Sequence, residues 1–485
     1  MAKTNLKQNV IYQTLYQILA TALPLITSPY IARTIGSDRL GVYSYTSSVA
    51  TYFMLFSMLG VNNYGARSIA LVKKHRNKRS RIFCEIFGLQ IILTVVFTCV
   101  YFVLIFLTEK ENIYIAVIQS ILVINCFFDI NWLYFGLEEI KVTVIRNCSM
   151  KIFALISIFV FVHDANDLWK YTLIMTVSTL ISELVLFINI RNYIDFVKVD
   201  FIGVIRHLKS NFILFIPIMA LSIYHYMDKT MLGILSSYRE SGYYYNVDKI
   251  INIPTGIITG LGTVMLPRFS KIVGEKDKEK FDSLFEKTIE LVFCTATPIA
   301  FGIFAISDNF VPWFLGMDYM KCSILLKVLV WVVYFKAISQ TIRTQYLIPC
   351  DKNREYIVAI TAGAFFNFII NYILIVKIGA MGAVIGTLLS EGIVCIDHCR
   401  VANQEIPLCN FIMNNIMYIF FGAIMCFGVR WISSIIAITN KTLLIGIEVV
   451  GGGLIYSILC YLYWNLKKSG LFYDGLKKKI PRLFK

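Results

Sequence analysis

The chain has 485 residues, of which 57% are hydrophobic and 16% are charged. Soluble domains carry about 25% charged residues, so this composition excludes an ordinary soluble protein and predicts one that crosses a membrane many times. The net charge of +16 is concentrated between apolar runs, and no nucleic-acid partner is expected. The 12 cysteines mostly lie inside apolar runs without a CxxC pair or metal-ligand spacing, which indicates buried small hydrophobes.

Apolar runs long enough to cross a bilayer, which takes about 20 helical residues, recur along the whole chain. The first run contains Pro24 and Pro29, and a membrane helix accepts such kinks only where packing or a cavity satisfies the backbone. We expect an all-α polytopic membrane protein with about 14 transmembrane helices. In chain order the runs are 10–35, 42–61, 82–107, 113–137, 148–162, 171–190, 212–235, 243–266, 288–306, 324–347, 357–376, 379–396, 411–431 and 443–464.

Most of the Lys and Arg residues fall in alternate connecting segments, such as 73–81 and 268–287. The positive-inside rule assigns these segments to the cytoplasm, which puts both termini inside. The connecting segment 191–209 has helical apolar spacing among cations and predicts a helix on the cytoplasmic membrane surface. The basic tail, 467–485, is expected to lie on the same surface and contact acidic lipids.

Enzyme motifs are missing from the sequence. No GxxxxGK[ST], HExxH, GxSxG or EF-hand pattern occurs, and the tail segment GLFYDGLK fails the first of these. No pair of carboxylates lies in a soluble, structured segment. We therefore expect no enzyme, no nucleotide-driven pump, no cofactor and no metal site.

An internal repeat relates the opening hairpin, residues 9–70, to the segment that begins at Phe212. Three residue pairs share one offset of 201 positions: Gly41 with Gly242, Tyr43 with Tyr244, and Arg67 with Arg268. Such a repeat gives two parallel halves of six helices each, an arrangement known in transporters. We expect an N-terminal bundle with its connector at 1–211, a second bundle at 212–403, and two additional helices with the tail at 404–485.

Charged residues at the ends of spans are the first candidates for a site, because a cation near hydrocarbon usually faces a protein or water-filled interior. Arg33 and Lys229 close the first span of each half on the outer side, against the positive-inside rule. Arg67 and Arg268 close the second spans on the inner side, where topology alone also explains them. Tyr43 and Tyr244 offer ring faces and hydroxyls beside these cations.

Buried carboxylates are the second group of candidates. Asp129 and Asn131 are two residues apart and are expected to point in different directions. Asp228 lies one turn after Tyr224, so a hydrogen bond to a tyrosine and an ion site both fit it. Glu391 fits either a proton site or an ion pair with Lys336. Asp129, Asp228 and Glu391 are therefore the candidates for ion coupling.

Six segments, in order, resemble the polysaccharide transporter family: PLITSPYIARTIG, GVYSY, LGVNNYGARSIA, MDKTMLG, ESGYYYNVDKI and VMLPRFSK. These are the Wzx-type flippases for O-antigen and capsule units, in the superfamily of multidrug and oligosaccharidyl-lipid exporters. The resemblance implies two six-helix bundles related by a pseudo-two-fold axis, with two extra C-terminal helices. It also implies a cationic cavity for an undecaprenyl-diphosphate-linked oligosaccharide, which would be flipped from the cytoplasmic to the outer leaflet by alternating access.

Two other functions compete with this one. A cation-coupled small-molecule exporter of the same fold should have a carboxylate-lined ion site and few cations. A polysaccharide polymerase or glycosyltransferase should have a sizeable extramembrane loop, and the loops here are short. The expected partners are the lipid-linked oligosaccharide, membrane lipids, and proteins of the export pathway such as a polysaccharide polymerase. The expected location is the bacterial or archaeal cytoplasmic membrane.

Overall fold

The computed structural model describes residues 23–467 except 436, 437 and 439. The chain divides into two compact units, Met1–Tyr245 and Asn246–Lys485. The first unit is longer than the expected first half because α10 (Leu208–Leu235) packs on α2 (Ser37–Met58) and α3 (Val61–Leu71). The division into a bundle at 1–211, a bundle at 212–403 and two added helices at 404–485 stays a prediction.

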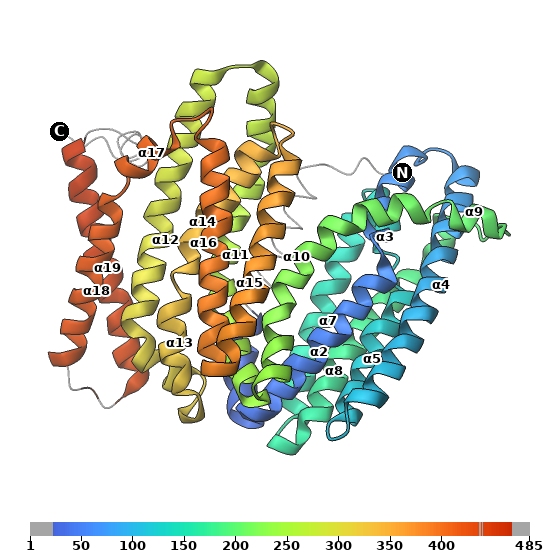
Figure 1. The fold of residues 1–485 in the computed structure, drawn as a ribbon, viewed down its shortest axis with the longest axis horizontal. Coiled ribbons are helices and arrows are strands. Elements are labelled where there is room, and N and C mark those ends of the chain that lie inside the picture. Colours follow the sequence, from blue (N-terminus) through green and yellow to red (C-terminus); the bar gives the residue numbers. More distant parts are fainter. Residues whose placement is uncertain (1–22, 436–437, 439, 468–485) are drawn as a thin grey trace. The chain divides into compact units, whose positions relative to one another are not determined.

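Unit 1 is built from helices packed side by side (Figure 1). Residues 23–35 are helical, and α2 and α3 follow them. The remaining elements are α4 (Arg76–Thr108), α5 (Ile113–Ile124), η1 (Asn125–Phe127), α6 (Asn131–Gly136), α7 (Ile140–Phe161), η2 (Ala165–Asp167), α8 (Leu168–Ile188), η3 (Ile190–Asn192), α9 (Phe201–Ile205), α10 and the first turns of α11 (Tyr238–Glu275).

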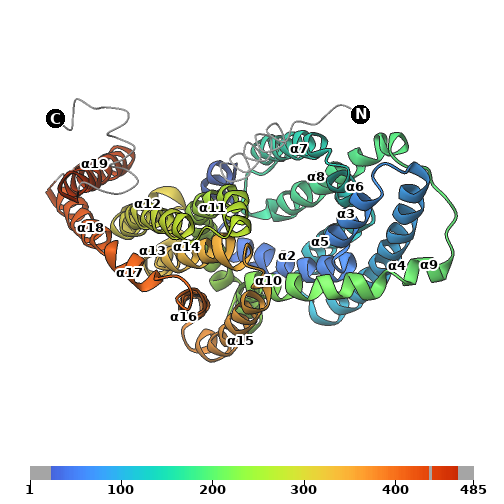
Figure 2. The ribbon, with the colours of Figure 1, turned by 90° about the horizontal axis from the view of Figure 1, so that it is seen from above.

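Unit 2 contains the rest of α11 and the helices that follow it. They are α12 (Lys278–Phe314), η4 (Met317–Tyr319), α13 (Lys321–Leu329), α14 (Val332–Ile342), the π-helix η5 (Arg343–Leu347), α15 (Asn353–Ile378), α16 (Ala380–Ala402), α17 (Leu408–Asn414), α18 (Met417–Ile435) and α19 (Lys441–Lys467). The last two helices, α18 and α19, pack against each other and against α12 at the edge of this unit (Figure 2).

Eleven helices of the described residues are long and apolar enough to cross a membrane. The pair Phe201–Ile216 and Leu221–Leu235, bent by 67°, makes a twelfth when it is counted as one span. These coincide with twelve of the fourteen predicted spans. The predicted span 42–61 is filled by α2 and the start of α3, but α2 is too rich in Ser, Thr and Tyr to count as apolar. Residues 10–22 of the first predicted span, like the tail after 467, lie outside the described residues.

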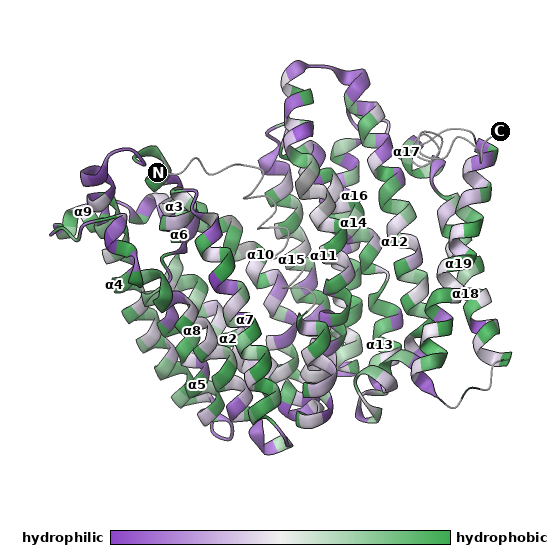
Figure 3. Cartoon of the chain, turned by 180° about the vertical axis from the view of Figure 1, so that it is seen from behind, coloured by the Kyte–Doolittle hydropathy of each residue, from purple (hydrophilic) through white to green (hydrophobic). Residues whose placement is uncertain are grey.

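The helix surfaces have the distribution expected of a membrane protein (Figure 3). Hydrophobic residues follow the helix shafts, and hydrophilic residues gather at their ends and in the connections. Along α4, for example, Val96, Val103 and Phe106 are exposed. Side chains of this kind are stable outside only against lipid, so the chain is a multi-pass membrane protein.

The connector between α8 and α10 differs from the expected surface helix over 191–209. Residues 194–200 have no regular secondary structure, the five-residue helix α9 follows them, and α10 begins at Leu208. The irregular part is held along α4: the Ser80 hydroxyl accepts from the Asp195 N–H at 2.9 Å, and Arg76 donates to the Asp195 carboxylate at 2.7 Å. This contact holds the pKa of the Asp195 carboxyl below its usual value. Bonds to α4 thus replace the local bonds of a helix.

Candidate functional site

A cluster of tyrosines surrounds Lys229 inside unit 1. The Lys229 ammonium lies 5.7 Å from the ring centre of Tyr245 and 5.9 Å from that of Tyr226, within the range of a cation–π contact. Tyr43 of α2 lies edge-on to Tyr245, with 6.1 Å between ring centres, and packs on Tyr171 of α8 at 4.8 Å. Three helices and the start of a fourth therefore place one cation among aromatic rings.

Tyr244 lies on the buried side of the same segment. It is 2% exposed, and its hydroxyl donates to the carboxylate of Asp228, which is 3% exposed. The tyrosine that bonds Asp228 is therefore from α11. The sequence had suggested Tyr224, which lies on α10 together with Asp228. Because Tyr43 and Tyr244 are both buried, they support the neighbouring Lys229 and Tyr245 rather than presenting open ring faces.

A close helix crossing brings these side chains together. A Cβ at Gly41 would lie 1.6 Å from the Tyr238 carbonyl oxygen, and one at Gly242 would lie 2.0 Å from the Ser37 carbonyl oxygen. Only glycine allows two helix backbones to approach in this way. The crossing sets α2 against the start of α11, and Tyr43 and Tyr245 then meet one turn or less away.

The three candidate arginines lie elsewhere. Arg33 is exposed on helix 23–35, and Arg67 is exposed on α3, where it makes no ion pair with any residue in the described ranges. Arg268 is exposed on α11 in unit 2. Binding of the substrate by Arg33, Arg67 and Arg268 stays a prediction.

A buried polar network joins α6, α7 and α8. Arg146 of α7 donates to Glu183 Oε2 at 3.0 Å and to Asn131 Oδ1 at 2.9 Å. The Asn131 amide nitrogen bridges two carboxylates, Glu183 at 2.9 Å and Asp129 at 2.7 Å. The expectation that Asp129 and Asn131 point in different directions is therefore wrong: the helix is interrupted at Asp129, and the two side chains meet.

The interruption between α5 and α6 is stabilised by a buried glutamine. Gln90 of α4 is 0% exposed, and its Nε2 donates to the backbone carbonyls of Cys126 and Asp129 at 2.5 and 3.0 Å. Its Oε1 accepts from the Trp132 indole at 3.1 Å. Carbonyls freed by a broken membrane helix need such partners, so Gln90 fixes the position of Asp129.

Sequence reasoning missed Arg146, because it lies between the predicted spans 113–137 and 148–162. The apolar run begins only at Cys148, yet α7 begins at Ile140 and carries Arg146 into the interior with 4% of its side chain exposed. Glu183, inside the run 171–190, was the available signal: a lone carboxylate within a span predicts a buried cation as its partner.

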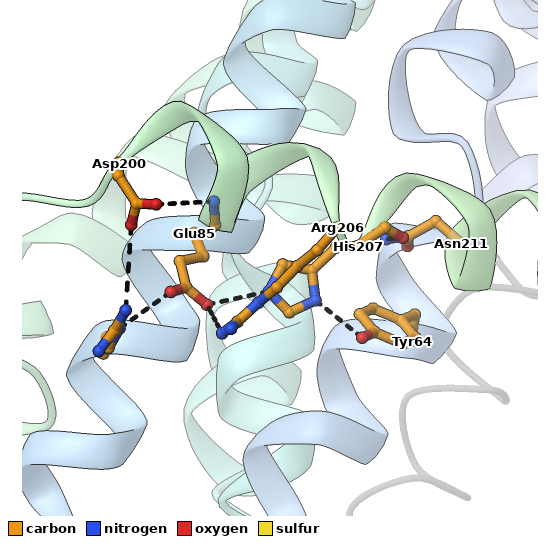
Figure 4. Close-up of polar contacts among 8 residues, drawn as sticks. Tyr64, Glu85, Asp200, Arg206, His207 and Asn211 are labelled. Carbon is orange, nitrogen blue, oxygen red and sulfur yellow. Dashed lines mark hydrogen bonds and ion pairs between the residues drawn. The ribbon is translucent and has the colours of Figure 1, made fainter.

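A second network ties the connector to α4 (Figure 4). The fully buried Glu85 carboxylate accepts from Arg206, from Arg81 at 3.0 Å and from His207 at 3.0 Å. The other ring nitrogen of His207 bonds the Tyr64 hydroxyl of α3 at 2.8 Å. One carboxylate thus holds the start of α10 against α4 and α3.

In unit 2, the ion-pair alternative for Glu391 is present. Its carboxylate lies 3.6 Å from the Lys336 ammonium, and both side chains are largely buried. This pair connects α16 with α14. Among the described residues, no group of His, Cys, Asp and Glu has the geometry of a metal site.

The fold is that of a known class of membrane transporters. A solved structure titled as the lipid II flippase MurJ in an inward closed conformation superposes with a TM-score of 0.72 at 15% identity, covering 95% of this chain and 100% of that one. An inward-facing multidrug transporter of the MATE family gives 0.62 at 11% identity, covering 80% and 95%. At these identities the likeness shows the fold alone.

Family models then identify the chain. Residues 6–273 match the model described as polysaccharide biosynthesis protein, and residues 143–450 match the lipid II flippase MurJ model. The chain belongs to the polysaccharide biosynthesis protein family, the Wzx-type O-antigen flippases of the multidrug/oligosaccharidyl-lipid/polysaccharide exporter superfamily. It is a transporter of the flippase type and not an enzyme.

Curated relatives are similar over most of their length. The "Putative O-antigen transporter" of Escherichia coli (strain K12) is 22% identical over 397 residues, which are 81% of this chain and 95% of that protein. The protein of the same description from Shigella dysenteriae is 22% identical over 80% of this chain and 97% of its own length. A "Probable low-salt glycan biosynthesis flippase" of Haloferax volcanii is 20% identical over about half of each chain, 53% and 54%.

Proposed function

We propose that this protein moves an undecaprenyl-diphosphate-linked oligosaccharide from the cytoplasmic to the outer leaflet by alternating access. The descriptions of its relatives, O-antigen transporter and glycan flippase, support a lipid-linked sugar as the substrate. The proposal includes a bacterial or archaeal cytoplasmic membrane with both chain termini on the cytoplasmic side. A polysaccharide polymerase that receives the exported unit would be the next protein in the pathway.

The observation that carries the proposal is Lys229 between the rings of Tyr226 and Tyr245. A diphosphate leaving water needs charge-assisted hydrogen bonds to replace its hydration. An ammonium supplies three donors, and adjacent tyrosines supply ring faces and hydroxyls for sugar units. Lys229 and its tyrosines thus combine both requirements in one place.

Arg33, Arg67 and Arg268 are the further candidates for the diphosphate. Their guanidinium groups can bind phosphate oxygens in a two-pronged geometry that lysine lacks. In this proposal they contact the headgroup at stages of the cycle other than the one at Lys229. The polyprenyl tail stays in lipid throughout, because leaving lipid would expose a long hydrocarbon chain to water.

A small-molecule exporter is the alternative, favoured by the superposition on a multidrug transporter. Lys229 among its tyrosines argues against this alternative, because its positive charge would repel the cationic drugs that a carboxylate-lined site attracts. The two functions are separated by offering purified protein both kinds of substrate. Transport of an organic cation without movement of lipid-linked sugar would favour the exporter.

The test uses purified protein in liposomes that contain a fluorescent lipid-diphosphate oligosaccharide and no ATP. Sugar exposed on the opposite leaflet is measured with an added lectin or glycosidase. Movement in protein-containing liposomes, absent from empty ones, is the expected result under an imposed ion gradient or membrane potential. No movement by correctly inserted protein under any gradient, with a matching sugar unit, would sink the proposal.

Variants of Lys229 test the site itself. Loss of one charge-assisted contact costs about 1.5–3 kcal/mol, so Lys229→Ala should lower transport roughly ten- to a hundredfold. Lys229→Arg should retain part of it. Tyr245→Phe keeps the ring and should stay close to wild type, whereas Tyr245→Leu should not. Equal transport by Lys229→Ala and wild type would remove this residue from the substrate site.

A further inference from the structure

We propose that Asp129 and Glu183, which are joined by the Asn131 amide next to the cation Arg146, form the proton-binding site that couples transport to the proton gradient. This inference rests on the proposed function for what is transported, but the site itself lies in unit 1 alone. The sequence offered Asp129, Asp228 and Glu391 as separate candidates for ion coupling. The inference goes beyond them because it places Glu183 and Arg146 in one network with Asp129.

The charge count is the first observation. The polar contacts of the network hold two carboxylates and one guanidinium. Glu183 has 12% of its side chain exposed and Arg146 has 4%. Asp129 is half-buried. With both carboxyls ionised, the cluster keeps one negative charge beyond the one that Arg146 balances, and a charge held away from bulk water is unfavourable. Uptake of one proton makes the cluster neutral.

The geometry allows the two carboxyls to act together. Both accept hydrogen bonds from the same amide nitrogen of Asn131, at 2.7 and 2.9 Å, so their accepting oxygens lie no farther apart than the sum of these two distances. Like charges this close favour the binding of a proton by one of them. The proton binds to a carboxylate oxygen while the site is open to one side of the membrane. It leaves that oxygen while the site is open to the other side.

A cavity beside Asp129 supplies the second, independent observation. It has a volume of about 110 Å³ and is also lined by Asn62 and Asn125, and this is room for several water molecules. The Asn125 Oδ1 atom on its wall lacks a hydrogen-bond partner, and so does Arg146 Nε inside the network. Buried polar atoms of this kind are normally satisfied by ordered water, which would carry protons to Asp129.

A proton fits the site better than a sodium ion does. The Arg146 guanidinium already donates to Glu183, to Asn131 and, at 2.8 Å, to Asn147, so it occupies the oxygens that a metal ion would need. No metal-binding group of side chains occurs within the described ranges. Cys126 and Tyr134 are titratable groups that also face the network, and the Tyr134 hydroxyl donates to the Leu186 carbonyl at 2.6 Å.

Coupling follows from where the carboxyls are attached. Asp129 lies in the interruption between η1 and α6, Arg146 on α7, and Glu183 on α8. Arg146 forms its ion pair with Glu183, and the Asn131 amide links this pair to Asp129. When both carboxyls are charged, the two negative charges repel each other across the Asn131 amide, and protonation of one of them removes this repulsion. Protonation thereby biases the packing of α6 against α7 and α8.

The first experiment compares transport of the labelled lipid-linked sugar with and without an imposed pH gradient. In wild type the gradient should increase transport several-fold, and a sodium gradient at uniform pH should not. For Glu183→Gln and Asp129→Asn, the transport rate with the pH gradient divided by the rate without it should fall to one, whatever the rate without the gradient. The control Glu111→Gln, an exposed carboxylate, should keep the wild-type ratio.

A second measurement needs no substrate. Infrared spectra of the purified protein, recorded through a pH titration, detect the C=O band of protonated carboxyls. The chain has 30 Asp and Glu residues, so the contribution of the site is taken from difference spectra. Subtracting the spectra of Glu183→Gln or Asp129→Asn from wild type should leave a pH-dependent carboxyl band, and subtracting those of Glu111→Gln should not leave the same band. Should wild type flip no sugar, the proposed function fails, and this titration still decides the proton site.

Two results would overturn the inference. One is sugar movement by wild type that follows a sodium gradient and ignores a pH gradient. The other is a carboxyl band and a gradient ratio that persist unchanged in both Glu183→Gln and Asp129→Asn.

Discussion

Gly41 of α2 and Gly242 of α11 lie at one helix crossing, and each faces the backbone carbonyl of the residue four positions before the other. Tyr238 faces Gly41, and Ser37 faces Gly242. The contact is reciprocal, and both partners are related by the same offset of 201 residues as the sequence repeat. Two related hairpins therefore meet at equivalent positions, and this is where Tyr43 approaches Tyr245.

The crossing predicts that alanine is not tolerated at either glycine. In Gly41→Ala the new methyl would lie 1.6 Å from a carbonyl oxygen, so the helices must separate. Overpacking of this kind costs about 1–3 kcal/mol. We expect a lower midpoint of thermal unfolding in detergent and a loss of transport. Gly274→Ala is the matched control, since a Cβ there meets nothing within 4 Å, and equal stability of the two variants would contradict this packing.

The Glu85 network predicts that the connector depends on one buried carboxylate. Glu85→Gln keeps the shape but removes the charge that binds Arg206 and His207. Hydrogen bonds to charged groups contribute about 1.5–3 kcal/mol, and the half-exposed Arg206 favours the lower end of this range. Urea or thermal unfolding of purified protein should show the loss, together with faster proteolysis of residues 194–207.

A matched control for this prediction is Glu138→Gln. Glu138 pairs with Lys73 at 2.9 Å, but 68% of its side chain is exposed, and exposed pairs contribute at most about 1 kcal/mol. Similar losses in both variants would mean that burial of Glu85 has no energetic consequence.

Orientation is tested with introduced cysteines. The loop after α4 contains the exposed Glu111, and the segment before α4 contains the exposed Lys74. In a cysteine-free background, a maleimide that cannot cross membranes should label Glu111→Cys on intact cells, and Lys74→Cys only after permeabilisation. The native Cys322 is 0% exposed and is unsuitable as an outer marker. The reverse labelling pattern would invert the expected topology.

Much of the fold could be read from the sequence because each span is one long apolar run, and burial of backbone polar groups in lipid requires a helix. The repeat at Gly41 and Gly242 was visible for a similar reason, since a glycine at equivalent positions indicates a close approach. Features made by tertiary contacts were not visible. The irregular segment 194–200 is held by side chains of α4, including Ser80 and Arg76.

The candidate site was predictable only in part. Lys229 and Tyr43 stand out in the sequence as a cation and an aromatic residue at repeat-related span ends. In the structure both of them contact Tyr245. The network of Arg146 escaped because two polar helical turns precede its apolar run. Hydropathy assigns such turns to a loop, although a buried carboxylate such as Glu183 can draw them inside.

The last prediction concerns pH and the pair Lys352–Glu405 at the loops of unit 2. The Lys352 ammonium lies 2.6 Å from Glu405 Oε1, and this contact holds the pKa of the Glu405 carboxyl below its usual value. A carboxyl whose pKa is lower in the folded state stabilises the fold above its unfolded-state pKa, about 4.3 for glutamate. That contribution is lost as the pH falls through the folded-state pKa. We therefore expect the unfolding midpoint of wild type to exceed that of Glu405→Gln at neutral pH, with the difference shrinking as the pH falls below about 4.3. Because 56% of the Glu405 side chain is exposed, solvent screens the pair and the difference should be small. Thermal unfolding of both proteins across this pH range measures it, and high salt should reduce it at neutral pH. A difference that stays constant down to strongly acid pH would show that packing of Glu405, and not its charge, stabilises the loop.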